Sequence, residues 1–261
     1  MIDSETPANP PPSTDRRSPW KWVIIAAVVA VVAATAGLFW FFGGDAPAEV
    51  DLSATASAVT ASTVSGQSAV PVGAGIEGTW VVDASVGEFS VTEETLATFA
   101  GFRVEEVLQS IGSNTAVGRS PAVSGSIAID GTTLTSAELV VDLTSMVSDE
   151  PRREDKIQQA LGTGSNPDAT FVLTEPVDLG EEAVAGDLVS VSAVGELTIN
   201  GVTNTVEIPL QAQLVDGMIL VTGSTELLFA DYGVNTPTAP VVLSVEDHGT
   251  LEFQLWFSLG N

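Results

Sequence analysis

The sequence predicts an all-β domain, an antiparallel barrel or sandwich with one short helix, that follows a single transmembrane helix. Apolar residues alternate with polar ones in several segments after Gly78, as in strands that bury one face. Asp-Gly and Asn-Gly pairs separate these segments, and such pairs favour tight hairpin turns. A long apolar run without a charge lies near the N-terminus. Periodicity alone leaves the choice between barrel and sandwich open.

The apolar run extends from Val23 to Phe42. About 20 helical residues rise about 30 Å, which is the thickness of the hydrocarbon core of a bilayer. We therefore expect a transmembrane helix over residues 20–42. Basic residues precede the run and acidic residues follow it, so the positive-inside rule places the N-terminus in the cytoplasm. These charges are Arg16, Arg17 and Lys21 before the run, and Asp45, Glu49 and Asp51 after it.

A cleaved signal peptide is the alternative, because Ala46-Pro47-Ala48 has the small residues of a cleavage site. Signal-peptide cores usually span only about 7–15 residues, and this apolar run is longer. We therefore expect a retained anchor in the cytoplasmic membrane, with the C-terminal domain outside the cytoplasm. The chain has no cysteine, which excludes a lipoprotein anchor and disulfide bonds.

The chain divides into four parts around this helix. Residues 1–19 are polar and proline-rich, which predicts a disordered cytoplasmic tail. Residues 20–42 form the expected transmembrane helix. Residues 43–77 consist mostly of Ala, Ser, Thr, Val and Gly with no strand or helix period, which predicts a flexible linker. Residues 78–261 are long enough to fold as one domain with a single core.

Alternation predicts the strands in chain order, beginning with residues 80–83. Turns are expected at Asp130-Gly131 and Asp216-Gly217. The later strands carry apolar side chains at every second position: Val123, Ile127 and Ile129; Ala137, Leu139, Val141 and Leu143; Phe171 and Leu173; Val206, Ile208, Leu210, Ala212 and Leu214; and Leu251, Phe253, Leu255, Phe257 and Leu259.

Residues 195–210 carry the clearest hairpin signal. Asn200-Gly201 supplies two residues that tolerate the positive φ of a tight turn. Leu197 and Ile199 precede the turn, and apolar residues continue the same phase after it. Glu196 and Glu207 fall on the opposite face. One face of this hairpin is therefore expected to meet a core and the other to meet water.

Helical signals are few. Residues 151–161 begin with a proline suited to a first helical turn, and they carry a narrow apolar stripe. We expect a helix there, with Asp149 or Glu150 available to cap it. A second, weaker helix is expected over residues 93–98.

The residues offer little for catalysis. The only histidine, His248, stands in a segment that reads as a solvent-facing turn, whereas a catalytic triad needs a buried and oriented imidazole. One histidine without cysteine argues against a zinc site, and no glycine-rich phosphate loop occurs. We predict no enzyme activity, no metal and no cofactor. The net charge of −26 predicts repulsion of nucleic acid.

Three motifs in register resemble the YceI-like family, whose members are extracytoplasmic lipocalin-like barrels that bind polyisoprenoid lipids. Residues 153–157 fit the family's short charged helix, Pro167 to Phe171 fits its Pro-x-small-x-Phe strand start, and Gly195 to Thr203 fits its Gly-x-Leu-Thr-Ile-x-Gly-Val-Thr hairpin. Lys156 and Asn200 stand where the family commonly has histidines. The resemblance covers residues 78–261.

The resemblance implies an antiparallel lipocalin-like β-barrel that holds a polyisoprenoid or isoprenoid-quinone lipid in an apolar lumen. Side chains in the shared inward phase are expected to contact the lipid tail: Leu139, Val141, Phe171, Leu173, Leu197, Ile199, Ile208, Leu210, Phe253, Leu255 and Phe257. A fully packed barrel that serves as a membrane-tethered structural or protein-interaction module, without a ligand, is the alternative. A homodimer also stays open, because barrels of this kind often pair.

The few cations beyond the anchor have two interpretations. Each could pair with a nearby carboxylate. Alternatively, Arg153 could stand at the barrel mouth, where its guanidinium would hold a quinone carbonyl or a phosphate. These cations are Arg103, Arg119, Arg152, Arg153 and Lys156.

Overall fold

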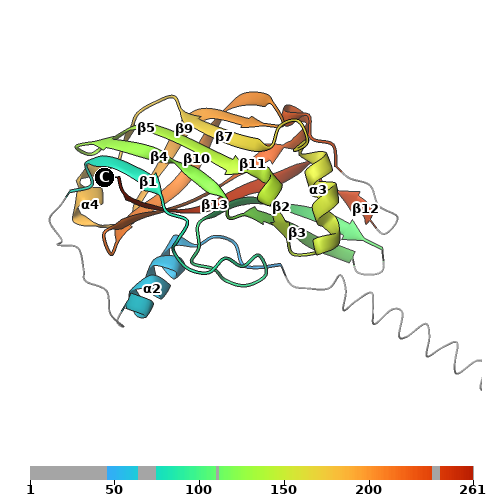
Figure 1. The fold of residues 1–261 in the computed structure, drawn as a ribbon, viewed down its shortest axis with the longest axis horizontal. Helices are drawn as coiled ribbons and strands as arrows, with labels where there is room; N and C mark the ends of the chain where they lie inside the picture. The colour runs from blue at the N-terminus through green and yellow to red at the C-terminus, as the bar shows by residue number, and fades with distance from the viewer. Residues whose placement is uncertain (1–45, 64–74, 110–111, 237–241, 261) are drawn as a thin grey trace, which may run out of the picture. The chain divides into compact units, whose positions relative to one another are not determined.

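The computed structural model describes residues 46–63, 75–109, 112–236 and 242–260 (Figure 1). The predicted tail (residues 1–19) and transmembrane helix (residues 20–42) lie outside this part of the chain. Within the described ranges, no helix has both the length and the apolar character needed to cross a bilayer.

Eight antiparallel strands close into a barrel, as the resemblance implied. They pair in the order β1-β4-β5-β7-β9-β10-β11-β13, and β13 pairs with β1 to complete the ring. The strands are β1 (Gly78–Val82), β4 (Val123–Asp130), β5 (Thr133–Asp142), β7 (Asp168–Leu173), β9 (Val189–Ile199), β10 (Val202–Val215), β11 (Met218–Leu228) and β13 (His248–Leu259). Closure therefore excludes the sandwich.

Additional strands extend the wall beyond the closed ring of eight. Strand β13 is long enough to pair with β1 near its C-terminus and with β2 (Phe99–Leu108) nearer its N-terminus, along the same edge. Strand β3 (Gly112–Ser120) pairs with β2, and the short β6 (Val147–Ser148) pairs with β3. Two more short strands, β8 (Val177–Asp178) and β12 (Val242–Val245), pair with β5 and β2.

The tight turns predicted at Asn200-Gly201 and Asp216-Gly217 are confirmed, whereas the one predicted at Asp130-Gly131 lies one residue later, at Gly131 and Thr132. Asn200 and Gly201 have φ values of 52° and 75°, and they join β9 to β10. Asp216 and Gly217 have φ values of 50° and 81°, and they join β10 to β11. Because φ is positive at both central positions, the chain twists as the two flanking strands require.

Helices α3 and α4 lie at opposite ends of the barrel (Figure 1). The helix expected over residues 151–161 is present as a 3-10 turn, η2 (Pro151–Arg153), followed by α3 (Glu154–Ala160). Helix α4 (Gly180–Ala185) was not predicted. Short 3-10 turns η1 (Leu143–Ser145) and η3 (Phe229–Tyr232) follow β5 and β11.

The helix expected over residues 93–98 is absent, and that prediction was wrong. The segment is a loop in which hydroxyl groups bond the backbone. The Ser90 hydroxyl accepts from the amide of Glu93 at 3.0 Å, and the Thr95 hydroxyl donates to the carbonyl of Glu88 at 2.7 Å. Ser and Thr side chains of this kind offer the backbone an alternative to helical hydrogen bonds.

Residues 46–63, predicted as part of a flexible linker, are instead ordered against the barrel. Helix α2 (Leu52–Thr63) begins after Asp51, whose carboxylate accepts from the amide of Ala54 at 3.0 Å. Leu52 is fully buried and packs in a cluster with Leu220 and Trp256. Sequence periodicity did not reveal α2 because the helix buries only a narrow apolar stripe. This stripe packs against Leu220 and Trp256, which lie more than 150 residues away in the sequence.

We predict that Leu220→Ala lowers the free energy of unfolding by about 2–5 kcal/mol, because it opens a cavity beneath α2. Leu220 is 0% exposed on the outer face of β11. The matched control is Leu228→Ala on the same face of the same strand, where the side chain is 48% exposed. Urea denaturation of both variants measures the difference. Equal losses would contradict the packing of α2 on this wall.

Candidate functional site

The predicted lumen residues share the inner face of the barrel. Residues that pair directly in an antiparallel ladder point to the same side of the sheet. One row joins Leu139, Phe171 and Leu197 across three strands, and another joins Leu210 to Phe253 through Gly223. The eleven side chains expected to face inward therefore do so, while their contact with a ligand remains a prediction. Leu197, Ile208, Leu255 and Phe257 are buried, and the other seven are half-buried.

Two clusters of buried side chains lie within the barrel. One cluster of buried residues includes Trp80, Ile129 and Phe257, together with Ala183 of α4. Another forms below α3, where Met146, Ile157 and Ala169 meet.

Phe171 and Leu210 belong to neither cluster and keep part of their surface accessible, although both face inward. Glycines stand beside two of the inner aromatic rings. A Cβ at Gly195 would lie 2.4 Å from the ring of Phe171, and one at Gly223 would lie 2.5 Å from the ring of Phe253. Each ring therefore rests against the wall at a glycine. Because each ring lies close to the backbone of the wall, part of its apolar surface faces the interior.

The guanidinium of Arg153 forms ion pairs with two carboxylates. Its guanidinium donates to Asp149 at 3.0 Å and forms an ion pair with the buried carboxylate of Glu106. Glu106 also accepts from the side-chain amide of Asn114 at 2.8 Å. The structure thus favours the ion-pair interpretation of Arg153 over its use as a ligand contact.

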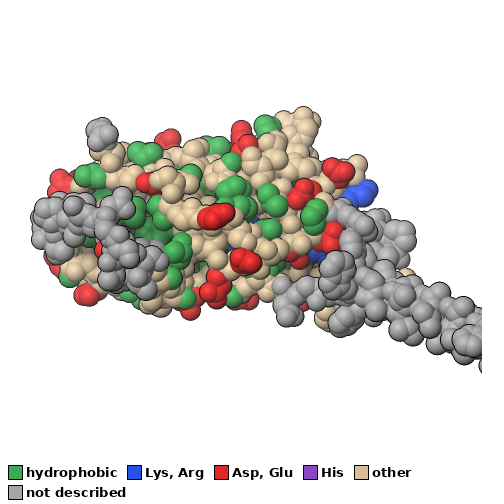
Figure 2. Space-filling view, turned by 60° about the horizontal axis from the view of Figure 1, so that its bottom comes forward, with side chains coloured by type: hydrophobic (Ala, Val, Ile, Leu, Met, Phe, Trp, Pro, Cys, Tyr) green, Lys and Arg blue, Asp and Glu red, His purple; other side chains and the backbone are tan. Residues whose placement is uncertain are grey.

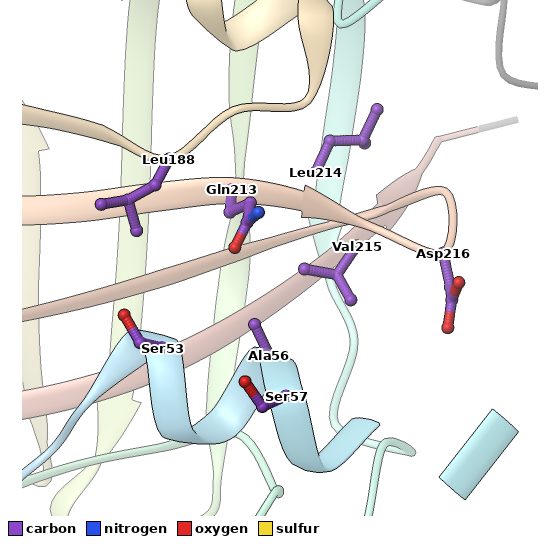
Figure 3. A pocket seen from close by; sticks show the side chains of 8 residues that line it. All are labelled: Ser53, Ala56, Ser57, Leu188, Gln213, Leu214, Val215 and Asp216. Atoms are coloured by element: carbon purple, nitrogen blue, oxygen red, sulfur yellow. The ribbon is translucent and has the colours of Figure 1, made fainter. Parts of the chain in front are cut away.

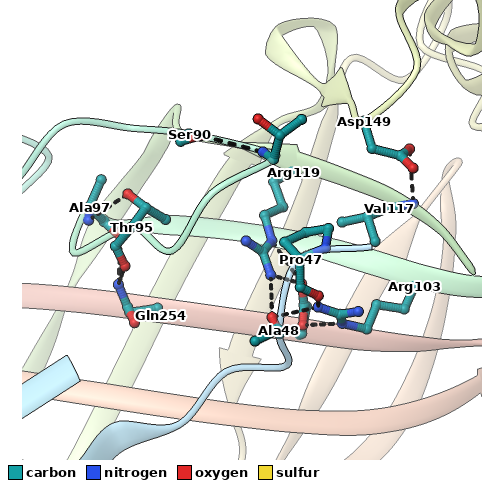
Figure 4. Close-up of polar contacts among 12 residues, drawn as sticks. Pro47, Ala48, Ser90, Thr95, Ala97, Arg103, Val117, Arg119, Asp149 and Gln254 are labelled. Atoms are coloured by element: carbon teal, nitrogen blue, oxygen red, sulfur yellow. Dashed lines mark hydrogen bonds and ion pairs between the residues drawn. The ribbon is translucent and has the colours of Figure 1, made fainter. Parts of the chain in front are cut away.

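A second ion-pair network lies on the outer face of β13. Pairing of Arg103 and Arg119 with carboxylates was one of the two interpretations of the sequence, but the sequence did not identify Glu252 as their shared partner. The carboxylate of Glu252 is 1% exposed and accepts from Arg103 and Arg119, each at 2.8 Å. Both guanidiniums also donate to the carbonyl of Ala48, and Arg103 donates to the carbonyl of Pro47 (Figure 4). The chain just before α2 therefore covers this network and supplies part of its hydrogen bonding.

Gln254 and Trp256 continue this buried outer row. Gln254 accepts from the Thr55 hydroxyl of α2 at 2.7 Å. Its side-chain amide donates to the carbonyls of Thr95 and Ala97 at 3.0 and 2.9 Å (Figure 4). The indole of Trp256 donates to the carbonyl of Leu96 at 2.7 Å. The segment containing α2 and the loop before β2 are therefore both hydrogen-bonded to side chains of β13.

An open groove runs between α2 and the end of β10 (Figure 3). It lies outside the barrel and contains none of the predicted ligand contacts. Its lining mixes small hydroxyls with apolar side chains: Ser53, Ala56, Ser57, Leu188, Gln213, Leu214, Val215 and Asp216.

His248 lies at the surface, at the start of β13. Its Nδ1 is 3.0 Å from Asp247, and its Nε2 is 3.7 Å from Glu226. The hydrogen bond with Asp247 raises the pKa of His248 above its ordinary value. Within the described ranges, Glu246, Asp247 and His248 form one group of three side chains that could approach a common ion, and both carboxylates are exposed. This geometry is that of a surface ion pair.

Comparison with known proteins identifies the domain. The sequence matches the family described as the YceI-like domain over residues 47–257. A polyisoprenoid-binding domain from Saccharophagus degradans, implicated in plant cell wall breakdown, is 20% identical with a TM-score of 0.52, and the match covers 69% of this chain and 98% of that one. BcnA from Burkholderia cenocepacia is 18% identical with a TM-score of 0.50, covering 67% and 98%. No curated protein sequence matches this chain.

We predict that Glu252→Gln lowers the free energy of unfolding by about 3–5 kcal/mol, because two buried guanidiniums lose their counter-charge. The control is Glu226→Gln on neighbouring β11, where the carboxylate is 69% exposed; we expect a change within about 0.5 kcal/mol there. Urea denaturation at neutral pH measures both. If the two variants lose the same stability, the network contributes no more than a surface charge.

Proposed function

This chain belongs to the YceI-like family, and from that premise we propose that its barrel binds a polyisoprenoid lipid of quinone or polyprenyl type in its interior. The observation that carries the proposal is the apolar inner wall, whose middle residues face inward and remain half-buried. A side chain in this position has surface to offer to a tail that lies along the barrel axis. The polyisoprenoid-binding domain of similar fold supports the same class of ligand.

The free energy of binding would come mainly from burial of the tail. Each CH₂ group removed from water contributes about 0.8 kcal/mol, so several isoprene units would give strong binding before any polar contact is made. Part of this gain is offset by the ordering of a flexible tail. Such a site discriminates between lipids by the length and thickness of their tails. Hydrogen bonds contribute little to its affinity.

The outer surface supports an internal site. The whole chain carries a net charge of −26, and acidic side chains are scattered over the face seen in Figure 2. Such a surface repels anionic headgroups. A lipid would therefore be held within the barrel, away from these charges.

We further propose that residues 20–42 anchor the domain to the cytoplasmic membrane, with the N-terminus inside and the barrel on the extracytoplasmic side. The apolar run and its flanking charges support this placement. The contacts of Pro47 and Ala48 support retention of the anchor. Cleavage after Ala48 would remove two carbonyl groups that accept from Arg103 and Arg119, and it would leave buried donors without partners.

We predict that the full-length chain, purified from its native membrane, yields a polyisoprenoid lipid in organic extracts analysed by mass spectrometry. Leu210→Trp should reduce this yield and weaken saturable quinone binding, because the indole would occupy space that the tail needs. The matched control is Val172→Trp, on the outward face of β7 where the side chain is 41% exposed. Its lipid content should equal that of the wild type.

The same variants separate a hollow barrel from the packed structural module. Overpacking a filled core costs about 1–3 kcal/mol, so a packed interior would make Leu210→Trp clearly less stable than Val172→Trp. A hollow interior would let Leu210→Trp fold with little loss. Absence of any extracted lipid, together with strong destabilisation by Leu210→Trp, would replace the lipid-binding proposal with the packed module.

We also predict that the mature protein retains residues 1–48. Intact-mass measurement of the chain extracted from membranes should give the uncleaved mass, and alkaline carbonate washing should leave the protein in the membrane fraction. An N-terminus at Glu49 would contradict the retained anchor.

A further inference from the structure

Two phenylalanine rings of the inner wall lie over glycines of neighbouring strands. An added Cβ at Gly223 on β11 would lie 2.5 Å from the ring of Phe253 on β13, and one at Gly195 on β9 would overlap the ring of Phe171 on β7. Non-bonded carbon atoms pack about 3.5–4.0 Å apart. Any side chain at either glycine would therefore have to displace the ring beside it.

Backbone conformation does not require glycine at these two positions. Neither Gly195 nor Gly223 has a positive φ, so each backbone is one that other residues also adopt. Both glycines are buried inside long strands, where glycine weakens the strand and often marks the close approach of another group. The close approach of neighbouring groups therefore accounts for glycine at both positions.

The two rings stand on opposite walls of the barrel. In the closed ring of eight strands, β7 is the fourth strand and β13 is the eighth, so four steps separate them in either direction. Phe171 faces inward because it pairs directly with buried Leu197, and Phe253 faces inward because it shares the phase of buried Leu255. Both rings keep part of their surface accessible. A chain molecule that follows the barrel axis would pass between them.

Each ring lies along the wall and does not project toward the axis. Phe253, Gly223 and Leu210 form one row across three neighbouring strands. The ring of Phe253 occupies the place that a side chain at Gly223 would take. With alanine at Gly223, the ring would have to turn away from the wall and into the interior. The glycine therefore keeps the middle of the lumen wider than the size of Phe253 alone would allow.

We propose that Gly195 and Gly223 set the width of the lumen, and that this width selects a methyl-branched isoprenoid tail over a straight alkyl tail. The inference rests on the proposed lipid-binding function and assigns residues to its tail selectivity. Each isoprene unit carries a methyl branch, so the tail is thicker than an alkyl chain of the same length. The rings of Phe171 and Phe253 leave room for the branches and offer apolar surface to them. A straight tail fits the same width with fewer contacts.

Gly223 is the better position for a test. Apart from the ring of Phe253, the nearest atom to an added methyl there is the carbonyl oxygen of Pro209, at 3.0 Å. Movement of the ring can therefore relieve most of the overlap. At Gly195 the carbonyl oxygen of Val172 would lie 2.6 Å from the added methyl, so alanine there would also shift the backbone.

The test uses the full-length chain in phosphatidylcholine nanodiscs, with protein-free nanodiscs as the blank for partition into the bilayer. One pair of probes is an isoprenoid quinone and the same quinone on a straight alkyl tail of equal main-chain length. The other pair is a polyprenol and a straight-chain alcohol of equal main-chain length. The variants are Gly223→Ala and the double variant Gly223→Ala with Phe253→Leu, which removes the ring. The control is Gly164→Ala, at an exposed turn position where an added methyl meets no atom within 4 Å.

We expect the wild type to bind the isoprenoid tail more tightly than the straight tail in each pair that it binds. Gly223→Ala should bind the isoprenoid probe roughly 10- to 200-fold more weakly, because the displaced ring takes space that a methyl branch needs. Its affinity for the straight tail should change little. The double variant should recover most of the isoprenoid affinity, and Gly164→Ala should match the wild type with both tails.

Other outcomes overturn the inference in distinguishable ways. Equal weakening of both tails in Gly223→Ala, or a wild type that prefers the straight tail, removes the selectivity role while leaving lipid binding intact. A double variant that folds without recovering isoprenoid binding shows that the ring is not the obstacle, and it removes that role too. If the wild type binds none of the four probes, the proposed function fails together with the inference.

Circular dichroism reports whether each variant folds. If Gly223→Ala does not fold, the double variant takes its place in the test. Folding of the double variant with isoprenoid binding supports the inference, because only the ring then excluded alanine. Failure of the double variant to fold shows that the backbone itself requires glycine at this position, and the inference is rejected.

Discussion

Strand β13 is buried on both faces, and the rest of the domain is arranged around that constraint. Alternation places Phe253, Leu255 and Phe257 toward the interior, and it places Glu252, Gln254 and Trp256 on the outer side. An outward row in a barrel usually meets water, but these three side chains are at most 2% exposed. Their polar groups need partners, so a second layer has to cover the wall and supply them.

That second layer joins the segment before the barrel to the barrel itself. Glu252 balances two arginines, and the carbonyls of Pro47 and Ala48 complete their hydrogen bonding. Buried ion pairs of this kind add little net stability compared with apolar packing, but removal of one partner is costly. The network therefore acts chiefly to fix the position of the segment before α2 on the outer face of β13.

The inner face of the barrel is lined mainly by apolar side chains, unlike the outer row of β13. The rings of Phe171 and Phe253 rest against glycines, and the larger buried cluster extends along the inner wall from Trp80 to Leu255. Seven of the eleven predicted lumen side chains nevertheless remain half-buried. The proposed lipid binding depends on this half-buried apolar surface.

Local sequence determined the strands, the tight turns at Asn200-Gly201 and Asp216-Gly217, and the inward phase of residues such as Leu197 and Phe253, because each depends on neighbours within a few residues. Tertiary structure alone decided the closure of β13 on β1, the docking of α2, and the pairing of Arg153 with Glu106. Alternation distinguishes the two faces of a strand but does not say what covers each one. That depends on partners tens to hundreds of residues away, so the outer row of β13 could not be recognised as buried until the chain was folded.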